Sequence, residues 1–315
     1  MARCLWPLAQ LYGALEILNR RCQQPKTLPV PVVSIGNLVA GGAGKTPTTI
    51  MLTNLLRREE WSPAILSRGY RGRMQNTFRK IDLAHDRAED VGDEPLLLAH
   101  HAPVWVGKNR YQTGLEAIAK DADILLLDDG MQHYRLARTI DFCLVGAHEG
   151  IGNGWLLPAG PLRESWQRGL DRCDALVIVG DPAHLHIDIP DNKPVFHASI
   201  KPVVHAPPPQ RVVAFAGIAY PDKFRDTLFA HGFDVLALHA FGDHQRIPER
   251  AINRMIREAS MMGANVITTE KDWIKLTDRQ RRTVMAYPIE IHIDDEMALL
   301  SFLRAHLPPA QSSSK

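Results

Sequence analysis

The chain has 315 residues, 45% of them hydrophobic and 23% charged, which is the composition of an ordinary globular protein with room for about two domains. Its net charge of +2 lacks the basic excess typical of nucleic-acid-binding proteins, so we expect no nucleic-acid partner. The four cysteines form no Cys-x-x-Cys pair, which excludes the spacing of common zinc modules and favours reduced thiols.

The first predicted element is an amphipathic helix near the N-terminus. Apolar side chains recur at helical spacing on one face: Leu5, Leu8, Leu11, Tyr12, Leu15 and Leu18. The uncharged stretch, residues 4–15, is too short to span a bilayer, which takes about 20 residues. Two interpretations stay open: a helix lying on a membrane surface or, more commonly, one packed on its own domain.

A strand predicted at residues 30–35 leads into a glycine-rich loop that ends in Gly44-Lys45-Thr46, and a helix is predicted at residues 48–58. This order is typical of a P-loop, whose backbone N–H groups bind the phosphates of a nucleotide. Lys45 would reach the outer phosphates, and the Thr46 hydroxyl would hold Mg²⁺. The predicted ATP-binding residues are Gly41, Gly42, Ala43, Gly44, Lys45, Thr46 and Pro47.

Further apolar runs alternate with helical patterns along the first two-thirds of the chain. Continuous apolar strands flanked by helices are typical of a sheet buried on both faces, so we predict a three-layer α/β/α domain with a mostly parallel sheet. The expected strands are residues 64–66, 104–106, 124–127, 142–145 and 175–179, and the expected helices are 94–101 and 111–120.

A proline-rich stretch at residues 201–209 indicates a linker. We therefore expect the P-loop domain at residues 1–205 and a second, smaller α/β domain at residues 206–315. Within the second domain, strands are predicted at 212–216, 235–239 and 266–269, with helices at 221–231 and 248–262.

Two groups of acidic residues border predicted elements. Asp128 and Asp129 end the strand at 124–127, the Walker B pattern in which a carboxylate reaches the Mg²⁺ of the nucleotide. Such a pair is also common in turns, but the P-loop favours the metal interpretation. Asp93 precedes a helix and would either accept a hydroxyl proton as a general base or cap the helix; its spacing alone favours the cap.

Basic and polar loops supply candidates for substrate binding. Arginines cluster at residues 68–73, and a second basic loop spans residues 107–110. Both would suit phosphate groups, although a solvated basic loop is an equally good interpretation. The candidates are Arg68, Arg71, Lys108, Asn109 and Arg110, together with Gln132, His133 and Glu164 from two further polar loops.

Three classes of P-loop protein compete at this point. A guanine-nucleotide switch needs an Asn/Thr-Lys-x-Asp motif, but Lys271 and Asp272 are adjacent. A partition-type ATPase has a lysine where this loop has Ala40, and the general consensus has a glycine where it has Val39. A second domain and extra basic loops favour a small-molecule kinase, with a nucleotide-driven switch or partner-binding NTPase as the alternative.

Several motifs in order resemble the tetraacyldisaccharide 4′-kinases, the lipid A 4′-kinases of Gram-negative bacteria. They cover nearly the whole chain: residues 34–47, 66–72, 92–95, 127–133, 157–164, 216–218, 243–244 and 269–272. One departure is Met131, where the family leads us to expect an aromatic residue.

The resemblance implies transfer of the ATP γ-phosphate to the 4′-hydroxyl of a tetraacylated disaccharide 1-phosphate, with ATP and Mg²⁺ as cofactors. The substrate would be a membrane-embedded glycolipid, reached by peripheral contact with the cytoplasmic face of the inner membrane. No obligate protein partner is evident.

The resemblance also implies roles for individual residues. Lys45 and Thr46 match the phosphate-binding lysine and the Mg²⁺-linked threonine, while Asp128 and Asp129 match the acid pair near the metal. The remaining catalytic matches are Asp93 as the base and His244, which would assist it from a second domain that closes the site.

Overall fold

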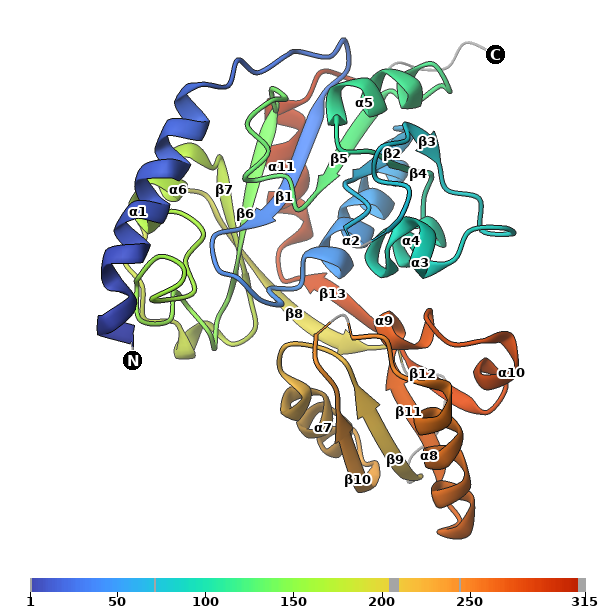
Figure 1. Cartoon of the computed structure of the whole chain (residues 1–315). Helices are drawn as coiled ribbons and strands as arrows, with labels where there is room; N and C mark the ends of the chain where they lie inside the picture. Colours follow the sequence, from blue (N-terminus) through green and yellow to red (C-terminus); the bar gives the residue numbers. More distant parts are fainter. Residues whose placement is uncertain (1, 71, 204–209, 244, 311–315) are drawn as a thin grey trace.

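The computed structural model of the chain describes residues 2–70, 72–203, 210–243 and 245–310. Within these ranges the chain forms one sheet of nine strands and a separate sheet of four, each flanked by helices (Figure 1). The predicted α/β class, a mostly parallel sheet with a second, smaller α/β unit, is confirmed.

The large sheet has the order β13-β8-β7-β6-β1-β5-β2-β4-β3. Its two edge strands pair antiparallel, whereas the strands between them pair parallel. Its inner strands are buried along their length, as their continuous apolar runs predicted. The strands are β1 (Val32–Asn37), β2 (Pro63–Ser67), β3 (Arg79–Lys80), β4 (Val104–Val106), β5 (Ile124–Asp128), β6 (Ile140–Gly146), β7 (Ala175–Val179), β8 (Val195–Pro202) and β13 (Ile289–Ile293).

Helices cover both faces of this sheet. On one face α2 (Lys45–Arg58), α4 (Asp93–Ala99) and α11 (Glu296–His306) share a core with the strands. On the other lie α5 (Arg110–Ile118) and α6 (Trp166–Arg172), each over its own core. The short α3 (Ala88–Val91) precedes α4, and the 3₁₀ turn η1 (Pro182–His184) follows β7.

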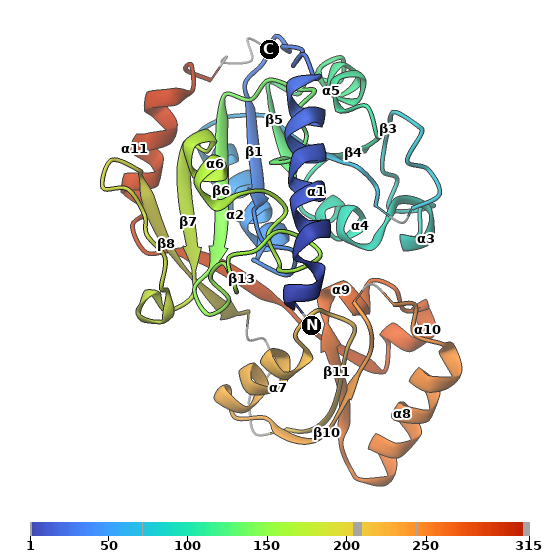
Figure 2. The same cartoon turned by 60° about the vertical axis from the view of Figure 1, so that its left-hand side comes forward.

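The N-terminal helix α1 (Ala2–Arg21) crosses the same face as α5 and α6 (Figure 2). It packs through small residues: Ala9 and Gly13 are buried, and a Cβ at Gly13 would lie 2.6 Å from a side-chain carbon of Leu156. Four leucines of the predicted stripe instead face outward and are 53–58% exposed: Leu8, Leu11, Leu15 and Leu18. Within the described ranges, no helix is long and apolar enough to cross a membrane.

The smaller unit is a four-stranded parallel sheet of order β10-β9-β11-β12. Its strands are β9 (Arg211–Ala216), β10 (Asp234–Ala240), β11 (Asn265–Thr269) and β12 (Val284–Tyr287). Its helices are α7 (Pro221–Ala230), α8 (Glu249–Met261), α9 (Glu270–Trp273) and α10 (Asp278–Arg281). Two separate cores on the faces of the sheet bury its apolar residues, as expected for a domain of its own.

The assignment of all residues after 205 to the second domain is wrong at the C-terminus. After β12 the chain returns to the large sheet, where β13 pairs antiparallel with β8. Helix α11 then buries Leu299 and Leu303 in the core around α2. The smaller domain is thus inserted between β8 and β13, and both strands connect the two units (Figure 1). Most of the predicted linker, residues 204–209, lies outside the described residues.

Candidate active site

The candidate site lies where the central strands of the large sheet end. Strand β1 has β5 on one side and β6 on the other, so the chain order reverses at β1. Ile35 of β1 pairs with Asp128 of β5, which places the P-loop and the acid pair side by side at the carboxyl edge. Ligands of open α/β sheets bind at such a switch point.

Two glycines of the P-loop adopt backbone angles with positive φ. Gly41 has φ 135°, and Gly44, which precedes the first residue of α2, has φ 81°. L-residues with a side chain rarely adopt such angles, so both positions require glycine. The helix begins at Lys45, three residues before the predicted start, so Thr46 and Pro47 belong to its first turn. The N-terminus of α2 and its backbone N–H groups thus form the cradle expected of a P-loop.

Val39 occupies the position of the missing glycine because the loop is extended there. It forms a β-bridge with Leu162, and the backbone N–H of Ala40 donates to the carbonyl of Pro161 at 2.8 Å. An extended residue needs no positive φ. The departure from the P-loop consensus therefore marks a pairing with residues 161–163 and leaves the phosphate-binding turn intact.

Asn37 holds the P-loop in shape, and sequence reasoning did not select it. Its buried side-chain amide donates to the carbonyls of Val39 (2.6 Å) and Gly41 (3.3 Å). Its side-chain oxygen accepts from the Lys45 ammonium at 3.2 Å, and that ammonium lies 3.6 Å from Asp129. Lys45 is thereby placed between the P-loop and the acid pair. The sequence does contain a signal for this role, because Asn37 stands between an apolar strand and a glycine-rich loop.

The two members of the acid pair differ in environment. Burial, followed by the charges of Glu94 and Asp129, raises the pKa of Asp128 to about 7, with Lys45 acting in the opposite direction. Burial would also raise the pKa of Asp129, but Lys45 and Arg163 outweigh it and lower that pKa below its usual value. Burial and the two neighbouring carboxylates thus disfavour the charged form of Asp128, and a bound cation would stabilise that form.

Arg110 and His133 lie beside this pair. Arg110 is buried, its Nη2 donates to the backbone carbonyl of Asp128 at 3.4 Å, and its Nε has no hydrogen-bond partner among the described residues. Burial lowers its pKa to about 10, which keeps it charged at neutral pH. Burial and the neighbouring arginines, Arg110 first, lower the pKa of His133 to about 3, so its imidazole is neutral.

A polar cluster closes the side of the site nearest α6. Arg163 donates to both carboxylate oxygens of Asp129 (2.9 and 3.0 Å) and to Gln132 (3.2 Å). Gln132 in turn donates to the Asn37 carbonyl and to buried Glu164, both at 3.1 Å. Glu164 also pairs with Arg172 of α6. The structure thus gives Gln132 and Glu164 a part in shaping the site, and their contact with substrate stays a prediction.

Asp93 is the first residue of α4 and not its cap. The cap position is Gly92, with φ 95°, and Asp93 Oδ1 accepts the adjacent N–H of Glu94 at 3.1 Å. The cap alternative is therefore off by one residue. The carboxylate is largely buried and lies 3.6 Å from Lys275 of the second domain. His244, its predicted assistant, lies outside the described residues.

The second domain meets α4 through a second lysine. Lys271 of α9 lies 3.3 Å from both Glu94 and Asp243. Burial lowers the pKa of Lys271, but the charges of Glu94, Asp93 and Asp243 outweigh burial and raise it. Lys271 lies in the family motif at residues 269–272 and in the failed guanine motif, but neither pattern predicted its contact with Glu94, which is far away in the chain.

The remaining basic candidates lie on the rim. Arg68 is exposed directly after β2, and Lys108 is exposed after β4. Asn109 caps α5, accepting the N–H of Gln112 at 3.3 Å. Arg71 is outside the described residues. The loop after β2 nonetheless lies against the end of α3, just before α4, since a Cβ on Gly72 would come within 2.6 Å of the Asp90 carbonyl.

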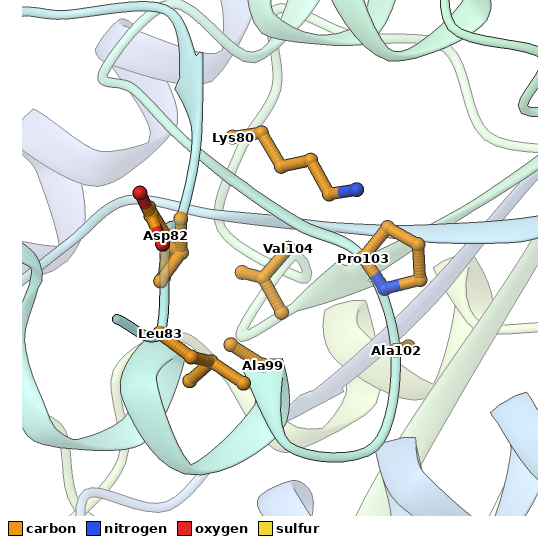
Figure 3. Close-up of a pocket in the computed structure, with 8 residues that line it drawn as sticks. Lys80, Asp82, Leu83, Ala99, Ala102, Pro103 and Val104 are labelled. Atoms are coloured by element: carbon orange, nitrogen blue, oxygen red, sulfur yellow. The ribbon is translucent and has the colours of Figure 1, made fainter. Parts of the chain in front are cut away.

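A surface hollow elsewhere in the molecule is not part of this site. It has a volume of about 470 Å³ and lies at the start of β4 and the end of α4, the opposite end from the P-loop. Figure 3 shows the apolar side chains of Leu83, Ala99 and Val104 grouped on one side of Lys80. This lining offers no phosphate-binding turn.

The comparisons with known proteins agree with the geometry. The family model of the tetraacyldisaccharide-1-P 4′-kinases matches residues 1–308. The tetraacyldisaccharide 4′-kinase of Dinoroseobacter shibae is 39% identical, over 98% of this chain and 94% of its own. That of Rhodospirillum rubrum is 40% identical, over 94% and 92%. The crystal structure of LpxK from Aquifex aeolicus in complex with ATP superposes with a TM-score of 0.78 at 29% identity, over 98% of this chain and 99% of that one.

The chain belongs to the tetraacyldisaccharide-1-P 4′-kinase family. Membership confirms the resemblance inferred from the motifs, and the class of enzyme is a kinase. The nucleotide-driven switch is not favoured, because the chain matches the kinase family over residues 1–308 and its relatives are named as kinases.

Proposed function

We propose that the chain transfers the γ-phosphate of ATP to the 4′-hydroxyl of tetraacyldisaccharide 1-phosphate, the step that forms lipid IV-A in lipid A biosynthesis. The observation that carries this proposal is the juxtaposition of the P-loop with Asp128 and Asp129, in a chain that matches the kinase family over residues 1–308. Phosphoryl transfer depends on positioning and on neutralising charge, and Lys45 stands where it would do both.

Asp93 is the best candidate for the general base. It is a largely buried carboxylate at the start of α4, a helix that contacts α2, and groups of both domains lie against it. A base in this place would accept the proton of the 4′-hydroxyl as the phosphate is transferred. The buried guanidinium of Arg110, with a donor still available beside the acid pair, suits a phosphate oxygen of the nucleotide or the acceptor.

The residues present also fit Mg²⁺. Mg²⁺ takes one or two protein carboxylates and completes its shell with water and phosphate oxygens. Asp128 lies in an environment that favours a cation, and Thr46 stands in the first turn of α2. Asp128, Asp129 and Thr46 would hold the ion, although no cluster of three or more carboxylate, histidine or cysteine ligands occurs among the described residues. The ion would neutralise charge on the phosphates when bound.

Contact with the membrane fits the outward leucines of α1. A substrate with four acyl chains lies in a bilayer, so the enzyme must dock there, and we place it on the cytoplasmic face of the inner membrane. The exposed stripe of Leu8, Leu11, Leu15 and Leu18, with Trp6 at 49% exposure, would enter the interface.

The test is to incubate the full chain with γ-labelled ATP, Mg²⁺ and tetraacyldisaccharide 1-phosphate in detergent micelles. A labelled lipid carrying a second phosphate is the expected product. Release of labelled phosphate without any labelled lipid would instead indicate an NTPase and contradict the proposal.

A further inference from the structure

A short chain of contacts links the core of the second domain to Asp93. It begins at Asp272, whose side chain is fully buried and accepts the backbone N–H of Gly217 at 2.7 Å and the hydroxyl of Thr269 at 2.9 Å. The Lys275 ammonium lies 2.7 Å from Asp272 and 3.6 Å from Asp93 Oδ2. One cation therefore bridges a fixed carboxylate of one domain and the candidate base of the other.

The burial of this bridge makes it more than a surface ion pair. The side chains of Lys275, Asp93 and Asp272 are 16%, 10% and 0% exposed. Solvent-exposed pairs contribute little to stability or geometry, whereas pairs shielded from water keep their orientation and their charge attraction. Asp272 is anchored by backbone and hydroxyl donors, so it fixes where the Lys275 ammonium can stand.

The bridge also sets the orientation of the Asp93 carboxylate. Oδ1 accepts the N–H of Glu94 and Oδ2 faces Lys275, so both oxygens are held. Alongside it, Lys271 holds Glu94, the next residue of α4. In both views α9 lies below α4, and the two helices are in contact (Figures 1 and 2).

We propose that Lys275 is a positioning residue, which orients the Asp93 carboxylate. Through Lys275, the base is correctly oriented when the second domain is docked. The inference rests on the proposed function, because it takes Asp93 as the group that accepts the 4′-hydroxyl proton. Lys275 itself transfers nothing. Its effect on the reaction passes through Asp93.

The experiment compares Lys275→Gln with Lys275→Arg. Glutamine keeps a donor for Asp272 but removes the charge, and arginine keeps both. For Lys275→Gln we expect kcat to fall about 10- to 100-fold with KM for ATP nearly unchanged, because a misplaced base affects turnover and not nucleotide binding. Lys275→Arg should recover most of the loss. Melting curves and ATP titration show which variants are folded.

The matched control is Arg246→Gln, which removes another cross-domain ion pair, with Glu89 at 2.8 Å, on an arginine that is 79% exposed. It should leave kcat unchanged. If it lowers kcat as much as Lys275→Gln does, general docking explains the effect and the positioning role is overturned. The role is equally overturned if Lys275→Gln is folded and fully active.

A double-mutant cycle separates this inference from the proposed function. Asp93→Asn should abolish most activity, and adding Lys275→Gln should then cost nothing further. Additive losses would show that Lys275 does not act through Asp93. An active Asp93→Asn enzyme would instead contradict the assignment of the base itself. If Lys275→Gln fails to fold, Lys275→Met, which also removes the charge and keeps much of the side chain's length, replaces it in the kinetic comparison and in the cycle.

Discussion

At the scale of single residues, the site depends on a few charges placed close together. Lys45 stands between Asn37 and Asp129, and Asp129 keeps a second cation, Arg163, at 2.9 Å. Removing Lys45 therefore leaves Asp129 paired with Arg163, and Arg110 still lies beside the buried Asp128. The fold should tolerate the change even though the chemistry does not.

We expect Lys45→Ala to lower kcat about 10²–10³-fold or more, because the proposed function assigns Lys45 to neutralise charge on the transferring phosphoryl group. The melting temperature should stay close to that of the parent. Steady-state kinetics and thermal melting check the two statements together. A folded Lys45→Ala enzyme with near-normal kcat would contradict the P-loop assignment.

At the scale of elements, α1 differs from an ordinary packed helix. It rests on the domain through Ala9 and Gly13 and by the Tyr134–Glu16 hydrogen bond of 2.7 Å. Leu8, Leu11, Leu15 and Leu18 point to solvent, whereas Leu5 is half-buried. An exposed apolar stripe that faces away from its own domain is typical of an interaction surface. The periodicity in the sequence predicted the stripe, but only the structure shows which way it faces.

Changing Leu8, Leu11 and Leu15 together to Ser should strongly reduce binding to liposomes and raise KM for the lipid. Each leucine is more than half exposed, so stability and ATP binding should hold. Cosedimentation with vesicles and ATP titration provide the measurement. The control changes Phe229 and Met261, exposed apolar residues of the second domain, to Ser. If both variants bind vesicles equally, α1 is not the docking surface.

At the scale of the whole molecule, the inserted domain is connected to the P-loop domain through β8 and β13, two strands of the large sheet. The C-terminal helix α11 completes the core around α2 with Leu299, Leu300 and Leu303. The stability of the P-loop domain therefore depends on residues at the far end of the chain. Motion of the inserted domain would have to occur about β8 and β13.

Leu303→Ala should destabilise the P-loop domain by about 2–5 kcal/mol, the usual cost of truncating a buried leucine. Met297→Ala, on the same helix but 66% exposed, is the matched control and should change little. Denaturant unfolding, followed with and without ATP, measures both. Equal effects of the two substitutions would contradict the packing of α11 in this core.

The sequence by itself determined the P-loop, the acid pair at the end of β5, the α/β class and the family, because each signal lies within a few neighbouring residues. Strand, turn and helix preferences act over that same short range. Tertiary structure alone decided that Val39 pairs with Leu162, that residues 289–307 rejoin the first sheet, and that Lys275 faces Asp93. Those contacts join segments far apart in the chain, and packing of whole elements, not local preference, selects them.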